Sequence, residues 1–256
     1  FPITPTPATT AAPATEEITQ IFQKTPSETV NFFGLNPRYS FINFIVGKGC
    51  ELAHAACQAV TAQLGKAYNP LFIYGGSGLG KTHLLQAVGN EVLRQDKKKK
   101  VVYATCEKFT NDFIHSVRSG QIKNFYDIYR KADLLLIDDI QFITGKAETQ
   151  EAFFNTFNDL HQQDKQIMIT SDRPPKAISL LENRLLSRFE MGMIADVAPP
   201  DFETRMAILQ TKCQEKNLPL EKDALNFIAN SIQNNVRELE GALNKLRAYY
   251  QLKKTV

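Results

Sequence analysis

Residues 75–82 read GGSGLGKT, so four glycines stand in eight positions and a lysine and a threonine end the segment. This order fits G-x-x-x-x-G-K-[ST], in which glycines let backbone N–H groups turn toward phosphate, the lysine adds charge and the hydroxyl serves Mg²⁺. A strand pattern precedes it and a helical pattern follows, which disfavours a plain glycine-rich connector. We expect a phosphate-binding loop formed by Gly75, Gly76, Ser77, Gly78, Leu79, Gly80, Lys81, Thr82 and His83.

The surrounding sequence alternates helical and strand patterns. Short apolar segments predict strands at 70–74, 101–105, 134–137 and 167–171, and helical spacing predicts helices at 50–64, 81–95, 107–117 and around 153–160. Apolar strands without polar alternation are typical of a parallel sheet covered by helices on both faces. The predicted fold class is therefore α/β.

The chain divides into three predicted regions. Residues 1–34 are rich in Pro and Thr and predict a flexible linker, and residues 35–198 predict a nucleotide-binding α/β subdomain. Pro199 and Pro200 end the strand pattern, Asp201 is placed to cap a new helix, and 199–256 predicts a small helical subdomain. Because the chain begins with Phe1, we expect it to be part of a longer protein.

Composition narrows the class without naming a partner. The chain has 256 residues, 43% of them hydrophobic, and a net charge of +3, too mild to indicate duplex DNA by charge alone. No apolar run is long enough for a membrane span and no signal peptide opens the chain, so we expect a cytoplasmic protein. Irregular spacing predicts reduced thiols and no metal site at Cys50, Cys57, Cys106 and Cys213.

Two acids follow a buried strand. In LLLIDD, Asp138 is placed to hold Mg²⁺ through water, and Asp139 to orient or deprotonate an attacking water. Alone, two acids at this position are equally well explained as a solvated strand end. The next strand ends in TSDRPP (170–175), where Thr170, Ser171 or Asp172 would reach the γ-phosphate or the water, unless this is an ordinary turn.

Three arginines lie away from the loop. Arg184 and Arg188 share one helical face, and an arginine held out from one subunit can stabilise phosphate charge on its neighbour. Without other context, a surface ion pair with Glu182 or Glu190 is the favoured interpretation. Arg237 in the first turn of the last helix is either solvated or directed back at the nucleotide.

In this order, GGSGLGKTH, LLLIDDIQF, TSDRPP, NRLLSRF and NVRELEGAL closely resemble the AAA+ core of the bacterial replication initiator family, DnaA. The resemblance covers residues 35 to about 250 and includes LNPRYSFINFIVGKGCELAHA. It implies an AAA+ P-loop sheet flanked by helices, followed by a helical lid, with ATP (or ADP) and Mg²⁺ as cofactors.

The resemblance also implies residue roles. Lys81 and Thr82 match Walker A and Asp138 and Asp139 match Walker B, with Thr82 and Asp138 at the metal. Asp172 lies in the sensor 1 segment, and Arg237 matches the sensor 2 arginine. Arg188 matches the arginine finger, with Arg184 nearby as the other candidate. The segment with Ile45 and Val46 is similar to the strip that covers adenine, and single-stranded DNA positions match Ile114, Lys146 and Thr149.

The family function implied is an ATP-dependent initiator that assembles head to tail on ATP and engages single-stranded DNA to open the origin. Duplex origin boxes would be read only by a C-terminal domain that we expect to be missing from this chain. The sequence departs from the pattern at Glu148, commonly basic, which weakens the expected attraction for DNA, and Asp139 is shorter than the Glu often found in AAA+ proteins, which predicts slow hydrolysis. The alternatives are a helicase loader or regulatory AAA+ paralogue and, more distantly, a metabolite kinase.

Overall fold

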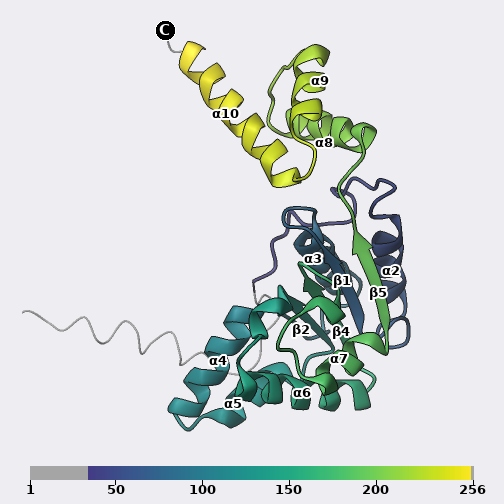
Figure 1. Ribbon diagram of the computed structural model, residues 1–256, viewed down its shortest axis with the longest axis vertical. Helices are drawn as coiled ribbons and strands as arrows, with labels where there is room; N and C mark the ends of the chain where they lie inside the picture. Colours follow the sequence, from purple (N-terminus) through teal and green to yellow (C-terminus); the bar gives the residue numbers. More distant parts are fainter. Residues whose placement is uncertain (1–33, 255–256) are drawn as a thin grey trace, which may run out of the picture. The chain divides into compact units, whose positions relative to one another are not determined.

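The computed structural model describes residues 34–254 of the protein (Figure 1). All but the last residue of the predicted linker, 1–34, lies outside the described residues. Among the helices of the described part, none combines the length and hydrophobicity needed to cross a bilayer. The four cysteines are free thiols, and all four are buried.

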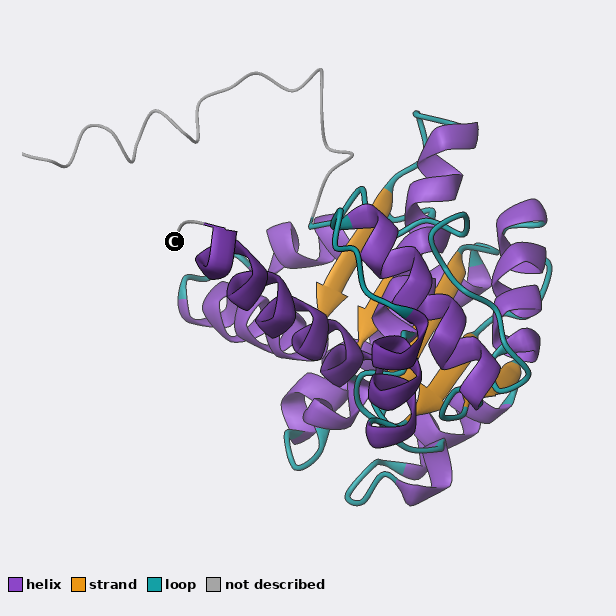
Figure 2. Ribbon diagram, turned by 90° about the horizontal axis from the view of Figure 1, so that it is seen from above, coloured by secondary structure: helices purple, strands orange, loops and turns teal. Residues whose placement is uncertain are grey.

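A five-stranded parallel sheet, in the order β2-β3-β4-β1-β5, forms the centre of the α/β subdomain. Figure 2 shows its strands in orange. The predicted fold class is confirmed. The strands are β1 (Leu71–Gly75), β2 (Val101–Thr105), β3 (Leu134–Asp138), β4 (Gln166–Ser171) and β5 (Met193–Val197). Gly75 pairs with Val197 and Thr105 with Asp138, so these strand ends meet at one edge of the sheet.

Helices cover both faces of this sheet (Figure 2). One apolar cluster joins residues of α2 (Glu51–Ala62) and α3 (Lys81–Gln95) to Leu134 and Leu136. The other joins Leu135 and Ile137 to α4 (Cys106–Arg118), α5 (Ile122–Tyr129), α6 (Ala147–Gln162) and α7 (Asn183–Glu190). Successive β3 side chains therefore enter opposite cores, as expected for a strand buried on both faces. Short 3₁₀ turns follow β3 and β4, at η2 (Ile140–Ile143) and η3 (Pro175–Ala177).

Aromatic rings fill the core on the α4–α7 side. Phe153 is fully buried, and its ring centroid lies 5.5 Å from that of Phe109 and 6.1 Å from that of Phe189. Phe189 in turn lies 5.4 Å from Phe72 of β1. These edge-on and tilted contacts join α4, α6 and α7 to the sheet, so this core depends on ring packing.

Three helices follow the sheet, α8 (Phe202–Glu215), α9 (Lys222–Ser231) and α10 (Val236–Lys254). As the sequence predicts, Asp201 caps α8, since its Oδ1 accepts a hydrogen bond from the backbone N of Thr204 at 2.9 Å. These helices have an apolar cluster of their own, which includes Leu209, Leu225 and Leu243. The helical region thus has its own core, separate from the two that cover the sheet.

We predict that Phe153→Ala lowers the stability of the α/β subdomain by about 3–5 kcal/mol, because it leaves a cavity among packed rings. Phe142→Ala is the matched control, since that phenylalanine is more than half exposed, and it should shift the midpoint of urea unfolding little. Equal shifts for the two variants would contradict a core that depends on ring packing at Phe153.

Candidate functional site

The loop between β1 and α3 turns back on itself at two glycines. Gly78 has a φ of +76° and Gly80 a φ of +98°, a left-handed backbone that favours glycine. Gly80 is the N-cap of α3, so the unpaired N–H groups of the first turn of α3 follow directly after the loop. The loop and helix start together form the kind of concave backbone surface that binds anions.

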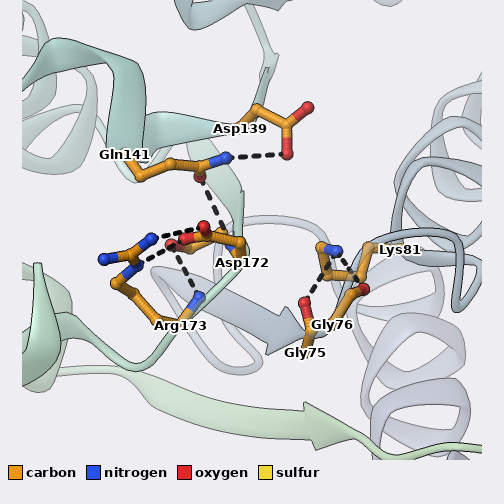
Figure 3. Close-up of polar contacts among 8 residues, drawn as sticks. Gly75, Gly76, Lys81, Asp139, Gln141, Asp172 and Arg173 are labelled. Atoms are coloured by element: carbon orange, nitrogen blue, oxygen red, sulfur yellow. Dashed lines mark hydrogen bonds and ion pairs between the residues drawn. The ribbon is translucent and has the colours of Figure 1, made fainter. Parts of the chain in front are cut away.

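Lys81, the first residue of α3, lies inside this loop. Its Nζ donates to the carbonyl oxygens of Gly75 and Gly76, both at 2.8 Å (Figure 3). Burial lowers the pKa of Lys81, while the nearby carboxylates of Asp139 and Asp138 act in the opposite direction. The ammonium group is already removed from bulk water, and a bound anion would therefore interact with it strongly.

Asp138 is a carboxylate buried to 3% exposure at the end of β3. It accepts three hydrogen bonds, from Thr82 Oγ1 at 2.8 Å, Tyr103 OH at 3.1 Å and Thr170 Oγ1 at 2.5 Å. Hydroxyl and carboxylate oxygens are the ligands that Mg²⁺ prefers, and it usually completes its shell with water and phosphate. Thr82 and Asp138 fit an ion held in this way, whereas no group of three or more His, Cys, Asp or Glu gathers within residues 34–254 to form an all-protein metal site.

Asp139 is held by a second set of contacts. Its φ of +56° turns the backbone, and its N–H donates to Thr170 Oγ1 at 2.9 Å. Gln141 Nε2 donates to Asp139 Oδ1 at 3.2 Å, while Gln141 Oε1 accepts from Asp172 N at 3.3 Å (Figure 3). Gln141 thus links the two acids. This role was not predicted from the sequence, although Gln141 stands only two positions after Asp139.

Asp172 forms a two-point contact with its neighbour. Arg173 donates to both carboxylate oxygens, at 2.8 and 2.7 Å, and these hydrogen bonds hold the pKa of Asp172 below its usual value (Figure 3). Asp172 is also close enough for its charge to act on Lys81. It belongs to the group of charges around the loop, and its expected role at the γ-phosphate stays a prediction.

A cavity of about 690 Å³ adjoins the loop, within the range of ligand sites. Ile45 lines it, whereas Val46 is exposed and does not. His83 of α3 also lines it. The remaining walls include the loop residues Leu79 and Gly80 and, from α8 and α10, Ile208, Val236 and Glu240.

The last helix begins against the phosphate-binding loop. Val236 N donates to Gly78 O at 3.1 Å, and the Asn235 side chain packs so close to Gly78 that a Cβ there would collide with it. Arg237 is the next residue, and its charge contributes to lowering the pKa of Lys81. The structure therefore brings Arg237 together with Lys81, Asp138, Asp139 and Asp172.

Arg184 and Arg188 lie elsewhere. Their helix, α7, leads into β5, whose first residue Met193 pairs with Leu71, at the opposite end of β1 from Gly75 (Figure 1). Both guanidinium groups lie over the ring of Phe154, at 4.7 Å for Arg184 and 5.8 Å for Arg188. These two arginines belong to the edge of the sheet that is remote from the phosphate-binding loop.

Their other contacts differ. Arg184 forms an ion pair with Glu182 at 2.5 Å, whereas Glu190 pairs with Lys176 at 3.5 Å. Within residues 34–254, Arg188 makes no ion pair, and its NH1 lies 3.9 Å from Met191 Sδ. The surface ion pair considered from the sequence is thus found for Arg184 and not for Arg188.

The three residues matched to DNA contacts differ in exposure. Ile114 on α4 and Lys146 at the N-cap of α6 are exposed. Thr149 is only 4% exposed and lies on the face of α6 that carries Phe153. The structure leaves Ile114 and Lys146 free to meet a ligand and places the Thr149 side chain inside, so a contact from Thr149 stays a prediction.

The sequence of this chain matches a known protein family. Residues 35–196 match the family described as the bacterial DnaA ATPase domain. The chain is 54% identical over 249 residues to the chromosomal replication initiator protein DnaA of Chloroflexus aurantiacus, covering 97% of this chain and 52% of that protein. This chain therefore spans about half the length of that relative.

Solved structures agree. The crystal structure of domain III of the Thermotoga maritima replication initiation protein DnaA has a TM-score of 0.84 and 46% identity, covering 87% of this chain and 92% of that one. A replication initiator DnaA bound to AMPPCP and single-stranded DNA has a TM-score of 0.78 and 40% identity, covering 87% of this chain and 69% of that one. This chain accordingly belongs to the bacterial DnaA ATPase domain family, an AAA+ ATPase fold, as its sequence motifs imply.

Proposed function

We propose that this chain is the ATP-responsive core of a cytoplasmic replication initiator, which assembles head to tail on ATP and engages one DNA strand to open the origin. The observation that carries the proposal is a division of charge between two edges of the sheet. Lys81, Asp138 and Arg237 gather at one edge, and Arg188, which has no ion pair within residues 34–254, lies near the other. The 54% identity to an initiator favours this function over that of a helicase loader.

ATP binds with its phosphates in the loop at residues 75–82. Lys81 would exchange its backbone carbonyl partners for phosphate oxygens, and Thr82 and Asp138 would hold Mg²⁺. The ion supplies positive charge to the phosphate oxygens, as in other P-loop proteins. The nucleoside enters the adjoining cavity beside Ile45 and His83. The AMPPCP held by a relative with 40% identity supports ATP as the ligand.

Hydrolysis is slow, and the nucleotide acts as a switch. Asp139 is the general base for the attacking water, and its carboxylate accepts a hydrogen bond from Gln141. A glutamate would extend one methylene further, but the left-handed backbone at Asp139 is tolerated better by Asp than by most residues. The backbone turn thus favours the shorter acid. Because this acid reaches less far, it positions the attacking water poorly.

Assembly follows from where Arg188 lies. It cannot reach the loop of its own chain, because the length of β1 separates the two edges. It can reach only the nucleotide of a neighbouring copy, where a triphosphate offers it more charge than a diphosphate. Such a joint uses two different surfaces, so it builds an open filament unless its rotation closes a ring.

Single-stranded DNA is engaged through α4 and the start of α6. Lys146 contributes positive charge and Ile114 an exposed apolar surface for bases. The negative charge of Glu148, in the first turn of α6, repels the phosphate backbone of DNA and weakens this binding. A relative solved with single-stranded DNA supports single-stranded DNA as the ligand.

We predict that Lys81→Ala weakens ATP binding by roughly a hundredfold or more, because a charge-assisted contact in a desolvated loop is lost. Isothermal titration of ATP with Mg²⁺ measures it. Lys108→Ala is the control, since Lys108 pairs with Asp112 on the exposed side of α4. A Lys81→Ala protein that binds ATP like the wild type would refute the phosphate site.

We predict that Arg188→Ala abolishes ATP-dependent assembly and leaves ATP affinity nearly unchanged. The contact is made only across the joint, so removing it affects association and not the site within one chain. Sedimentation velocity with ATP, with ADP and without nucleotide measures assembly, each with and without single-stranded DNA.

Arg184→Ala is the matched variant on the same helix face. Because Arg184 is held by Glu182, this variant should assemble nearly as the wild type does. Loss of assembly in Arg184→Ala but not in Arg188→Ala would assign the finger to Arg184. Equal sedimentation of all three proteins with ATP would reject the joint.

We predict that Asp139→Glu hydrolyses ATP several-fold faster than the wild type, because the longer acid reaches further toward the water. Single-turnover hydrolysis measures the rate. Thermal unfolding of the same sample accounts for the backbone strain at this position. A rate at or below that of the wild type in a folded variant would mean that the length of the acid does not limit turnover.

A further inference from the structure

Three polar side chains on α3 hold the segment that leads into the cavity. His83, Gln86 and Asn90 share one face of the helix by their spacing. They contact the backbone of residues 36–40, which forms neither helix nor strand. Backbone groups in such a segment lack ladder partners, so side chains have to supply their hydrogen bonds.

Four contacts make up this attachment. They are Asn36 N donating to Gln86 Oε1 at 2.7 Å, Asn90 Nδ2 donating to Asn36 O at 2.9 Å and to Tyr39 O at 2.7 Å, and His83 Nε2 with Ser40 O at 2.8 Å. A carbonyl only accepts, so His83 Nε2 carries the proton. Burial also lowers the pKa of His83, which keeps the ring neutral at neutral pH. The attachment is thus complete without a charged group.

Apolar contacts support the same attachment. The ring of His83 lies 4.9 Å from Tyr39 and 5.2 Å from Phe44, centroid to centroid. Phe44 in turn lies so close to Gly80 that a Cβ there would be 3.0 Å from its ring. The segment held by α3 therefore leads to Phe44, whose ring packs on the phosphate-binding loop.

We propose that Gln86 and Asn90 are positioning residues that, together with His83, set the wall of the cavity facing the nucleoside, and so determine how tightly ATP binds relative to a bare triphosphate. This inference rests on the proposed function. On this side the cavity is lined by residues of the held segment and by those that follow it, namely Asn36, Arg38, Tyr39, Asn43, Phe44, Ile45 and Gly47.

A variant of Asn90 tests positioning separately from direct contact with a ligand. It does not line the cavity, so it acts on a ligand only through Asn36 and Tyr39. Beyond the wall, the chain enters α2, which is anchored by buried Ala53, Cys57 and Val60. Losing the Asn90 contacts would therefore loosen the wall at the end that α3 holds, while α2 still holds its other end. The sheet and the phosphate-binding loop would stay in place.

The test compares the affinities of two ligands for the wild type, one variant and one control. ATP and inorganic tripolyphosphate, each with Mg²⁺, are titrated into wild type, Asn90→Ala and the control Gln95→Ala, whose side chain is exposed on the same helix and donates a hydrogen bond to Glu91. We expect Asn90→Ala to lose roughly tenfold in ATP affinity, since the wall must then be ordered on binding, and to bind tripolyphosphate like the wild type. The control should change neither affinity.

A second pair of variants guards against a folding defect. His83→Gln keeps an N–H donor and should retain most ATP affinity, whereas His83→Ala should lose it. Unchanged ATP affinity in Asn90→Ala, or equal losses for both ligands, would overturn the inference. A wild-type protein that binds neither ligand would overturn the proposed function and this inference with it.

Discussion

A buried carboxylate needs hydrogen-bond donors, and Asp138 takes them from three different elements. Thr82 belongs to the start of α3, Tyr103 to β2 and Thr170 to β4. The end of β3 thereby fixes where α3 begins relative to the neighbouring strands. Because Lys81 precedes Thr82, the same contacts fix the lysine and the glycine loop before it. The site cannot shift without leaving a buried charge short of partners.

Local pattern was enough to predict most of the sheet and the loop. Each of the strands β1 to β4 is a short apolar segment, and the two loop glycines with a left-handed backbone, Gly78 and Gly80, stand within the quoted motif. β5 was missed because Asp196, its fourth residue, interrupts the apolar run. α5 was missed because it is only eight residues long and follows a helix closely.

Contacts between distant segments could not be predicted in this way. Tyr103 reaches Asp138 from a neighbouring strand, and Asn90 reaches Asn36 across 54 positions. No spacing rule links such pairs, since they are set by how distant segments pack together in the fold. The burial of Thr149 was different, because it lies four residues before Phe153 on the same face of α6. That periodicity was present in the sequence.

Under the proposed function, two arginines meet the phosphates of one ATP from different molecules. Arg237 belongs to the same chain, because α10 begins with a backbone hydrogen bond to Gly78. Arg188 belongs to the neighbour, since β1 separates the two edges by roughly 16 Å at 3.3 Å per residue. One triphosphate then joins the lid to the loop and one copy to the next. Removing the γ-phosphate weakens both contacts together, so slow hydrolysis is what allows an assembly to persist long enough to act.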